Sequence, residues 1–186
     1  ESILISRDAS EARELVERYI LGEPEEIRSK LAVEPVLRMH TLAMIASEFV
    51  RTEKELKEFF SKTFYAFQYG SIDVIEDKID ELLEKLEEWK FIKKEDSKIV
   101  ATKIGKRVSE LYIDPLTAHN FITALEKSEG KDVAAFSFLQ TICNTIEMQP
   151  LLSVRTGEFS EIENLILQRE NQFLQEIPEE WDLDFE

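Results

Sequence analysis

The sequence predicts a mainly α-helical protein in which three helices are followed by a β-hairpin and then by further helices. Only five glycines and five prolines occur among 186 residues, so long flexible linkers are not expected. Apolar residues recur at helical spacing through most of the chain, and two short apolar runs flank a charged turn at one place. Because 43% of the residues are hydrophobic, the chain is able to bury a core.

The first 22 residues are predicted to form a short strand and one helix. Ile3–Ile5 is a short apolar run, and Asp8 and Glu11 have the spacing of a capping box. The helix ends at Gly22 and carries apolar residues at helical spacing: Leu15, Val16, Tyr19 and Ile20. One strand cannot form a sheet, so we expect it to pair elsewhere in this chain, in a dimer, or in a sheet outside the chain.

Three amphipathic helices are predicted after a linker over residues 23–35. The linker is expected because proline disfavours a helical conformation in the residue before it. The first helix covers residues 36–50, the second opens at a capping box, Thr52 to Glu55, and extends to Gly70, and the third opens at Ser71. Their apolar faces are, in order, Leu37, Leu42, Ile45 and Phe49; Leu56, Phe59, Phe60, Phe64 and Phe67; and Ile75, Ile79, Leu82, Leu83 and Leu86.

A β-hairpin is predicted between residues 89 and 101, around the turn Glu95-Asp-Ser-Lys98. The turn contains no glycine, which weakens the pattern. Three helices followed by a hairpin is the order of a winged helix, and we assign this domain to residues 36–112. Thr102 is then expected to cap one more helix, whose Ile104, Val108 and Leu111 lie at helical spacing.

Asp114 and Pro115 are predicted to form a joint between the winged helix and a helical bundle over residues 113–186. Aspartate is a favoured N-cap, and proline suits the first helical position. Removal of this cap is expected to cost about 1 kcal/mol. Further helices are predicted over residues 116–125, 133–146 and 159–174, and residues 177–186 form an acidic tail with two aromatic residues.

The net charge of −16 and the pI near 4.6 predict long-range repulsion between this chain and DNA. Residues 71–90, the position of a recognition helix, contain eight acidic and three basic residues, a net charge of −5. Such a helix is not expected to enter a major groove between phosphates. It is either a solvated face or a surface that docks onto protein.

The opposite sign occurs over residues 93–107, which carry a net charge of +4. We therefore expect weak contacts with the DNA backbone, or else an ordinary lysine-rich wing. No aromatic residue lies among these cations, so any contact should be independent of base sequence. The candidate DNA-backbone residues are Lys93, Lys94, Lys98, Lys103, Lys106 and Arg107.

No catalytic, cofactor-binding or metal-binding residue is predicted. The chain has no phosphate-binding Gly-x-x-x-x-Gly-Lys-Ser/Thr loop, so we do not expect it to hydrolyse ATP alone. Its one cysteine, Cys143, and its two separated histidines, His40 and His119, argue against zinc sites and catalytic triads. His119 is better explained as a polar helix position, although paired carboxylates are too abundant to exclude by counting. We expect a soluble, cytoplasmic protein with no membrane partner.

Residues 31–42, 102–115 and 116–121 resemble segments of archaeal superfamily-2 DNA helicases of the Hjm (Holliday-junction-migration) type. The resemblance implies that this chain is a fragment, with residues 1–22 completing the second motor domain and residues 113–186 beginning a larger bundle. It further implies a 3′ to 5′ helicase acting on branched or stalled-fork DNA, with ATP and Mg²⁺ bound elsewhere in the parent protein. DNA and the motor domains are the expected partners. The alternative is a stand-alone winged-helix regulator or protein-interaction adaptor.

Overall fold

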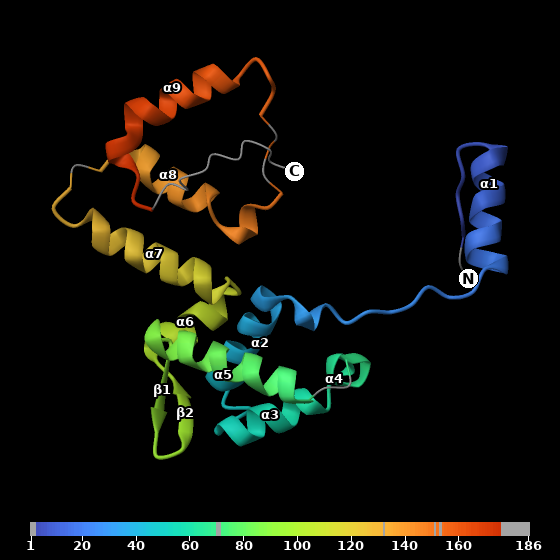
Figure 1. The fold of residues 1–186 in the computed structure, drawn as a ribbon, viewed down its shortest axis with the longest axis horizontal. Helices are drawn as coiled ribbons and strands as arrows, with labels where there is room; N and C mark the ends of the chain where they lie inside the picture. Colours follow the sequence, from blue (N-terminus) through green and yellow to red (C-terminus); the bar gives the residue numbers. More distant parts are fainter. Residues whose placement is uncertain (1–2, 70–71, 132, 151, 153, 176–186) are drawn as a thin grey trace.

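The protein is mainly helical, with one two-stranded antiparallel sheet among the residues that the structure describes. A computed structural model describes residues 3–69, 72–131, 133–150, 152 and 154–175. The predicted order of helices followed by a hairpin is confirmed, and these elements build a winged helix (Figure 1). In this view the first helix lies apart at the end of an extended linker, and the last helices extend from the opposite side of the winged helix.

Helix α1, Ala9–Val16, begins as predicted, because the Asp8 carboxylate accepts hydrogen bonds from the backbone N–H groups of Ser10 and Glu11. A π-helical turn, Glu17–Leu21, extends it to Gly22. The strand predicted at Ile3–Ile5 is absent. A strand requires a neighbour, and the two described strands pair with each other.

Helix α2, Glu34–Ala46, starts two residues before the predicted position, within the expected linker. Proline fits the first turn of a helix, so Pro35 lies inside α2 and does not precede it. The helix ends before Glu48, whose φ is 58°, and Phe49 falls outside it with 67% of its surface exposed. The other predicted core residues of this segment are buried: Leu37, Leu42 and Ile45.

The second predicted helix is divided into α3, Glu53–Ser61, and α4, Phe64–Tyr69. The Thr52 to Glu55 capping box opens α3 as predicted. Thr63 interrupts the helix, because its hydroxyl donates to the Phe60 carbonyl at 2.7 Å and accepts from the Ala66 N–H. Leu56 and Phe60 are buried, whereas the remaining predicted core residues are exposed: Phe59, Phe64 and Phe67.

Helix α5, Ile72–Glu88, provides the centre of the core. All five apolar residues predicted for this helix are buried, although its expected start at Ser71 and the preceding Gly70 lie outside the described residues. The hairpin follows as strands β1, Ile92–Glu95, and β2, Lys98–Ala101. Asp96 and Ser97 have φ values of 46° and 67°, so they form the two-residue turn of a hairpin without glycine.

Helix α6, Lys103–Leu111, is capped by Thr102 as predicted, but its buried face differs from the prediction. Val108 is buried as predicted and Gly105 is buried with it, whereas Ile104 and Leu111 are each 51% exposed. The reason is the close approach of α6 to the segment between α5 and β1: a Cβ at position 105 would lie 2.0 Å from the Phe91 carbonyl oxygen.

The C-terminal half contains helices α7, Pro115–Ser128, α8, Ala135–Cys143, and α9, Phe159–Arg169. Short 3₁₀ turns follow α8 at Ile146–Met148 and α9 at Glu170–Gln172, so the last two helices are shorter than predicted. The acidic tail at residues 177–186 lies outside the described residues. Among the described helices, none has the length and apolar character needed to cross a membrane.

We predict that Gly105→Ala destabilises the winged helix by about 1–3 kcal/mol, because the new methyl group would overlap backbone atoms that cannot rotate away. Gly157→Ala is the matched control, since a Cβ at position 157 meets no atom within 4 Å. Urea unfolding of both variants measures the difference. Equal stability of the two would contradict the packing of α6 on Phe91.

Candidate functional site at the joint and the wing

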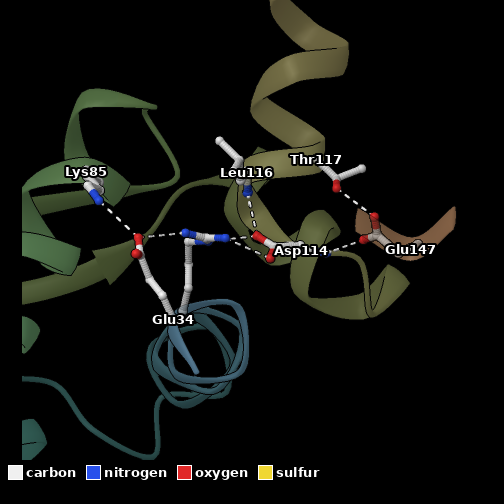
Figure 2. Close-up of polar contacts among 7 residues, drawn as sticks. Glu34, Lys85, Asp114, Leu116, Thr117 and Glu147 are labelled. Carbon is white, nitrogen blue, oxygen red and sulfur yellow. Dashed lines mark hydrogen bonds and ion pairs between the residues drawn. The ribbon is translucent and has the colours of Figure 1, made fainter. Parts of the chain in front are cut away.

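A buried ion pair joins the winged helix to the first helix of the bundle. Arg38 on α2 donates from Nε to Asp114 Oδ1 at 2.7 Å and from Nη2 to Asp114 Oδ2 at 2.8 Å (Figure 2). Arg38 is 3% exposed and Asp114 1% exposed, although 76 residues separate them. This two-point contact fixes the distance and the relative orientation of the two side chains.

Asp114 is at the same time the N-cap of α7. Its Oδ1 atom accepts from the Leu116 N–H at 2.7 Å, as the sequence predicts for Asp114 followed by Pro115. One carboxylate therefore both starts α7 and receives the guanidinium of α2. The direction in which α7 leaves the winged helix is set by these contacts.

The ion pair continues to α5 through Glu34. Arg38 Nη1 and Lys85 Nζ each lie 3.0 Å from Glu34 Oε1. The hydrogen bond from Lys85 lowers the pKa of Glu34, despite the opposing effect of burial, and the charges of Lys85 and Arg38 lower it further. Residues from α2, α5 and α7 thus form one connected polar network, which Figure 2 shows as a continuous path.

Glu147, in the 3₁₀ turn after α8, completes the start of α7 from outside the helix. Its carboxylate accepts from the Asp114 N–H at 2.8 Å and from the Thr117 hydroxyl at 2.6 Å. In a capping box the N3 side chain accepts from the N-cap N–H; here N3 is Thr117, and Glu147 supplies the carboxylate. Burial raises the pKa of Glu147, but the hydrogen bonds from Thr117 and Asp114 outweigh it and hold the pKa below its ordinary value of 4.5.

Aromatic contacts lie beside the ion pair. The Trp89 ring is stacked on the His119 ring, with 5.0 Å between centroids, and the Arg38 guanidinium lies 5.8 Å from the Trp89 centroid. His119 therefore packs from α7 onto Trp89 of the winged helix. Among the described residues, no group of three or more His, Cys, Asp or Glu side chains is arranged to hold a metal ion.

The six predicted DNA-backbone cations are all exposed, but they do not form one surface. Strand register places Lys93 and Lys98 on the outward face of the hairpin and Lys94 on the opposite face, where its Nζ lies 3.9 Å from Glu87. On α6, Lys106 pairs with Glu48 and Arg107 with Glu110. Among the described residues, no carboxylate oxygen forms an ion pair, at 4.0 Å or less, with the Nζ atom of Lys93, Lys98 or Lys103.

Sequence reasoning found part of the joint and missed the rest. Asp114 and Pro115 occupy the predicted cap positions, whereas Arg38 and Glu147 were not identified. An arginine between Leu37 and Leu42 on the apolar face of a predicted helix was the available signal, since arginine is almost never fully buried without a partner. No local pattern in the sequence singles out Glu147 among so many acidic residues.

Comparison with known proteins agrees with this fold. A family model described as a helix-turn-helix domain matches residues 1–93. The ATP-dependent DNA helicase Hel308 of Methanocella arvoryzae is 38% identical over 189 residues, which is 100% of this chain and 25% of the relative. The Hel308 proteins of Methanocaldococcus jannaschii and Thermococcus kodakarensis are 38% and 34% identical, over 85% and 96% of this chain and 13% and 16% of their own lengths. These matches confirm the resemblance to archaeal superfamily-2 helicases, and the chain spans a quarter or less of these relatives.

We predict that Asp114→Ala costs about 3–5 kcal/mol, more than the 1 kcal/mol expected for a cap alone, because buried Arg38 loses its buried partner and keeps only the half-exposed Glu34. Arg38→Met combined with Asp114→Ala should be more stable than Asp114→Ala, since no buried charge then lacks its buried partner. Urea unfolding of the four proteins of this double-mutant cycle measures the coupling.

The exposed pair Arg107 and Glu110 is the control, because surface ion pairs contribute about 0–1 kcal/mol. Additive effects of the Arg38 and Asp114 substitutions would show that the two side chains are not coupled in solution.

Proposed function

The chain belongs to the helix-turn-helix domain family, and from this premise we propose that it is the winged-helix region and first bundle helices of an ATP-dependent DNA helicase. Its full-length match to part of Hel308 supports the proposal. The parent protein would move 3′ to 5′ on branched or stalled-fork DNA during repair and recombination, using ATP and Mg²⁺ bound by its motor domains. The role of this chain is mechanical: it carries movement from the motor to the bundle.

The buried pair of Arg38 and Asp114 is the observation that carries the mechanical role. Replacing a buried ion pair by apolar residues of similar volume often leaves stability unchanged or increases it, so stability alone does not account for this pair. A planar guanidinium bound at two points restricts rotation, which apolar packing does less strictly. The pair therefore suits a joint whose angle must be kept while force passes through it.

The charge distribution supports a sequence-independent contact with DNA. Helix α5 is acidic on its exposed side, so it is unsuited to a major groove. Lys93, Lys98 and Lys103 remain available for phosphates on the hairpin and at the start of α6. A stand-alone regulator would instead need a basic recognition helix, which makes that alternative the weaker one.

We predict that replacing Lys93, Lys98 and Lys103 together with glutamate abolishes the weak DNA binding of this chain. None of these three cations forms an ion pair with a described carboxylate, whereas Lys94, Lys106 and Arg107 each do. Fluorescence anisotropy with single-stranded and forked DNA at low salt measures the binding, and the slope of log affinity against log salt should fall as phosphate contacts are lost.

Replacement of Lys127, Lys131 and Arg155 with glutamate provides the control, because that triple variant has the same net charge and alters exposed residues of the C-terminal half, away from the hairpin. Equal loss of binding in both variants would mean that total charge, and not the wing, determines affinity.

We predict that Pro115→Gly combined with Glu147→Gln in the full-length parent lowers the number of base pairs unwound per ATP hydrolysed, while ATP turnover is nearly unchanged. These substitutions loosen the start of α7 without exposing the charge of Arg38. The matched control is Glu163→Gln, the same chemical change at an exposed position of α9. Parallel unwinding and ATPase assays give the ratio, and an equal fall in both rates would contradict the mechanical role.

A further inference from the structure

The side chain of Gln68 holds the backbone of the linker between α1 and the winged helix. Its Nε2 group donates to the Ile27 carbonyl at 2.6 Å, and its Oε1 atom accepts from the Ser29 N–H, also at 2.6 Å. About 40 positions of sequence separate the two partners, since the contacts span 41 and 39 residues. One amide therefore satisfies two backbone groups of a distant segment.

The geometry of this contact resembles the addition of a strand. In an extended chain, backbone groups two residues apart point to the same side, so the Ile27 carbonyl and the Ser29 N–H both face α4. The side-chain amide of Gln68 has one donor and one acceptor in the spacing needed to meet both. The contact requires that residues 27–29 are extended and that the Ile27 carbonyl and the Ser29 N–H both face Gln68.

The linker is anchored on both sides of this contact. Toward the winged helix, the Ser29 hydroxyl accepts from the Leu31 N–H at 3.3 Å, and Leu31 packs against the core. Toward α1, Arg18 Nε donates to Glu25 Oε1 at 2.9 Å. Glu26 is the single residue between the Glu25 and Ile27 anchor points. A short segment with so little freedom acts as an arm of defined direction.

Burial of apolar surface does not account for this arrangement. Ile27 is 78% exposed, and Glu23, Glu25, Glu26 and Arg28 are also exposed. Polar linkers of this kind remain flexible unless specific contacts order them. The hydrogen bonds of Gln68 are the described side-chain contacts that connect residues 27–29 to the body of the winged helix.

We propose that Gln68 is a positioning residue that fixes the direction in which the linker leaves the winged helix, and so sets the angle between α1 and the winged helix. The consequence for unwinding rests on the proposed function, in which α1 is the end of the motor. The chain then has two angular constraints: the Gln68 contact on the motor side and the ion pair of Arg38 and Asp114 on the bundle side. Gln68 itself touches neither DNA nor nucleotide in this role.

The direct test measures the distance between α1 and the winged helix in this 186-residue chain. Spin labels are attached at Glu14→Cys on α1 and Lys54→Cys on α3, in a Cys143→Ser background that removes the native exposed cysteine. Double electron–electron resonance should give a narrow distance distribution for the labelled chain that retains Gln68 and a clearly broader one after Gln68→Ala. Lys62→Ala, an exposed neighbour just before α4, is the control and should leave the distribution narrow.

Gln68→Glu separates the two hydrogen bonds. The variant keeps an acceptor for the Ser29 N–H but places a carboxylate against the Ile27 carbonyl, so the distribution should broaden as it does in Gln68→Ala. Trypsin provides an independent readout, because Arg28 lies within the held segment, residues 27–29, and Lys30 follows it. Cleavage there should be about tenfold faster in Gln68→Ala, since proteolysis follows the population of the locally opened chain.

Equal distance distributions and equal cleavage rates in Gln68→Ala and in the labelled chain that retains Gln68 would overturn the proposal, whatever the function of the full-length protein. The midpoint temperature of thermal unfolding should be the same in Gln68→Ala as in the chain with Gln68. A merely structural role would lower this temperature at the same time as it broadens the distance distribution and speeds cleavage. In the full-length parent, Gln68→Ala should reduce unwinding per ATP at least twofold. An unchanged ratio beside a broadened distance distribution would overturn the mechanical role of the arm and leave the contact itself established.

Discussion

The buried ion pair between Arg38 and Asp114 is the constraint on which the arrangement of the two halves depends. It satisfies a guanidinium inside the winged helix and a carboxylate at the start of α7, so neither half can be moved without uncovering a charge. Glu34 and Glu147 extend the contact to α5 and to the turn after α8. The winged helix and the start of the bundle therefore behave as one body with a defined angle.

The charge of the winged helix differs between its helix α5 and its hairpin. An acidic α5 is suited to protein neighbours, whereas the cations of the hairpin and of α6 are suited to phosphates. Ion pairs with Glu87, Glu48 and Glu110 neutralise several of these cations, so contacts with DNA are expected to be few and sensitive to salt. In the helicase that we propose as the parent, few and weak contacts suit translocation, because tight binding at one place would oppose it.

Local patterns in the sequence predicted the elements that are stabilised locally. Capping residues such as Thr52, Thr102 and Asp114 and the apolar face of α5 were identified because their signals lie within a few residues. The strand expected at residues 3–5 failed because a strand depends on a neighbour. Arg38, Glu147 and Gln68 act through partners 30 to 76 residues away, so nothing in their local sequence identified those partners.

Amide hydrogen exchange at the joint tests most directly whether the winged helix and α7 form one rigid body. The N–H groups of Asp114 and Leu116 are bonded to Glu147 and Asp114, respectively. If the joint opens only when the winged helix unfolds, these two amides should exchange with the same opening free energy, and the same denaturant dependence, as the amide of buried Leu83 in α5. Exchange through a local opening that is independent of denaturant, with Leu83 still protected, would contradict the claim that this joint is rigid.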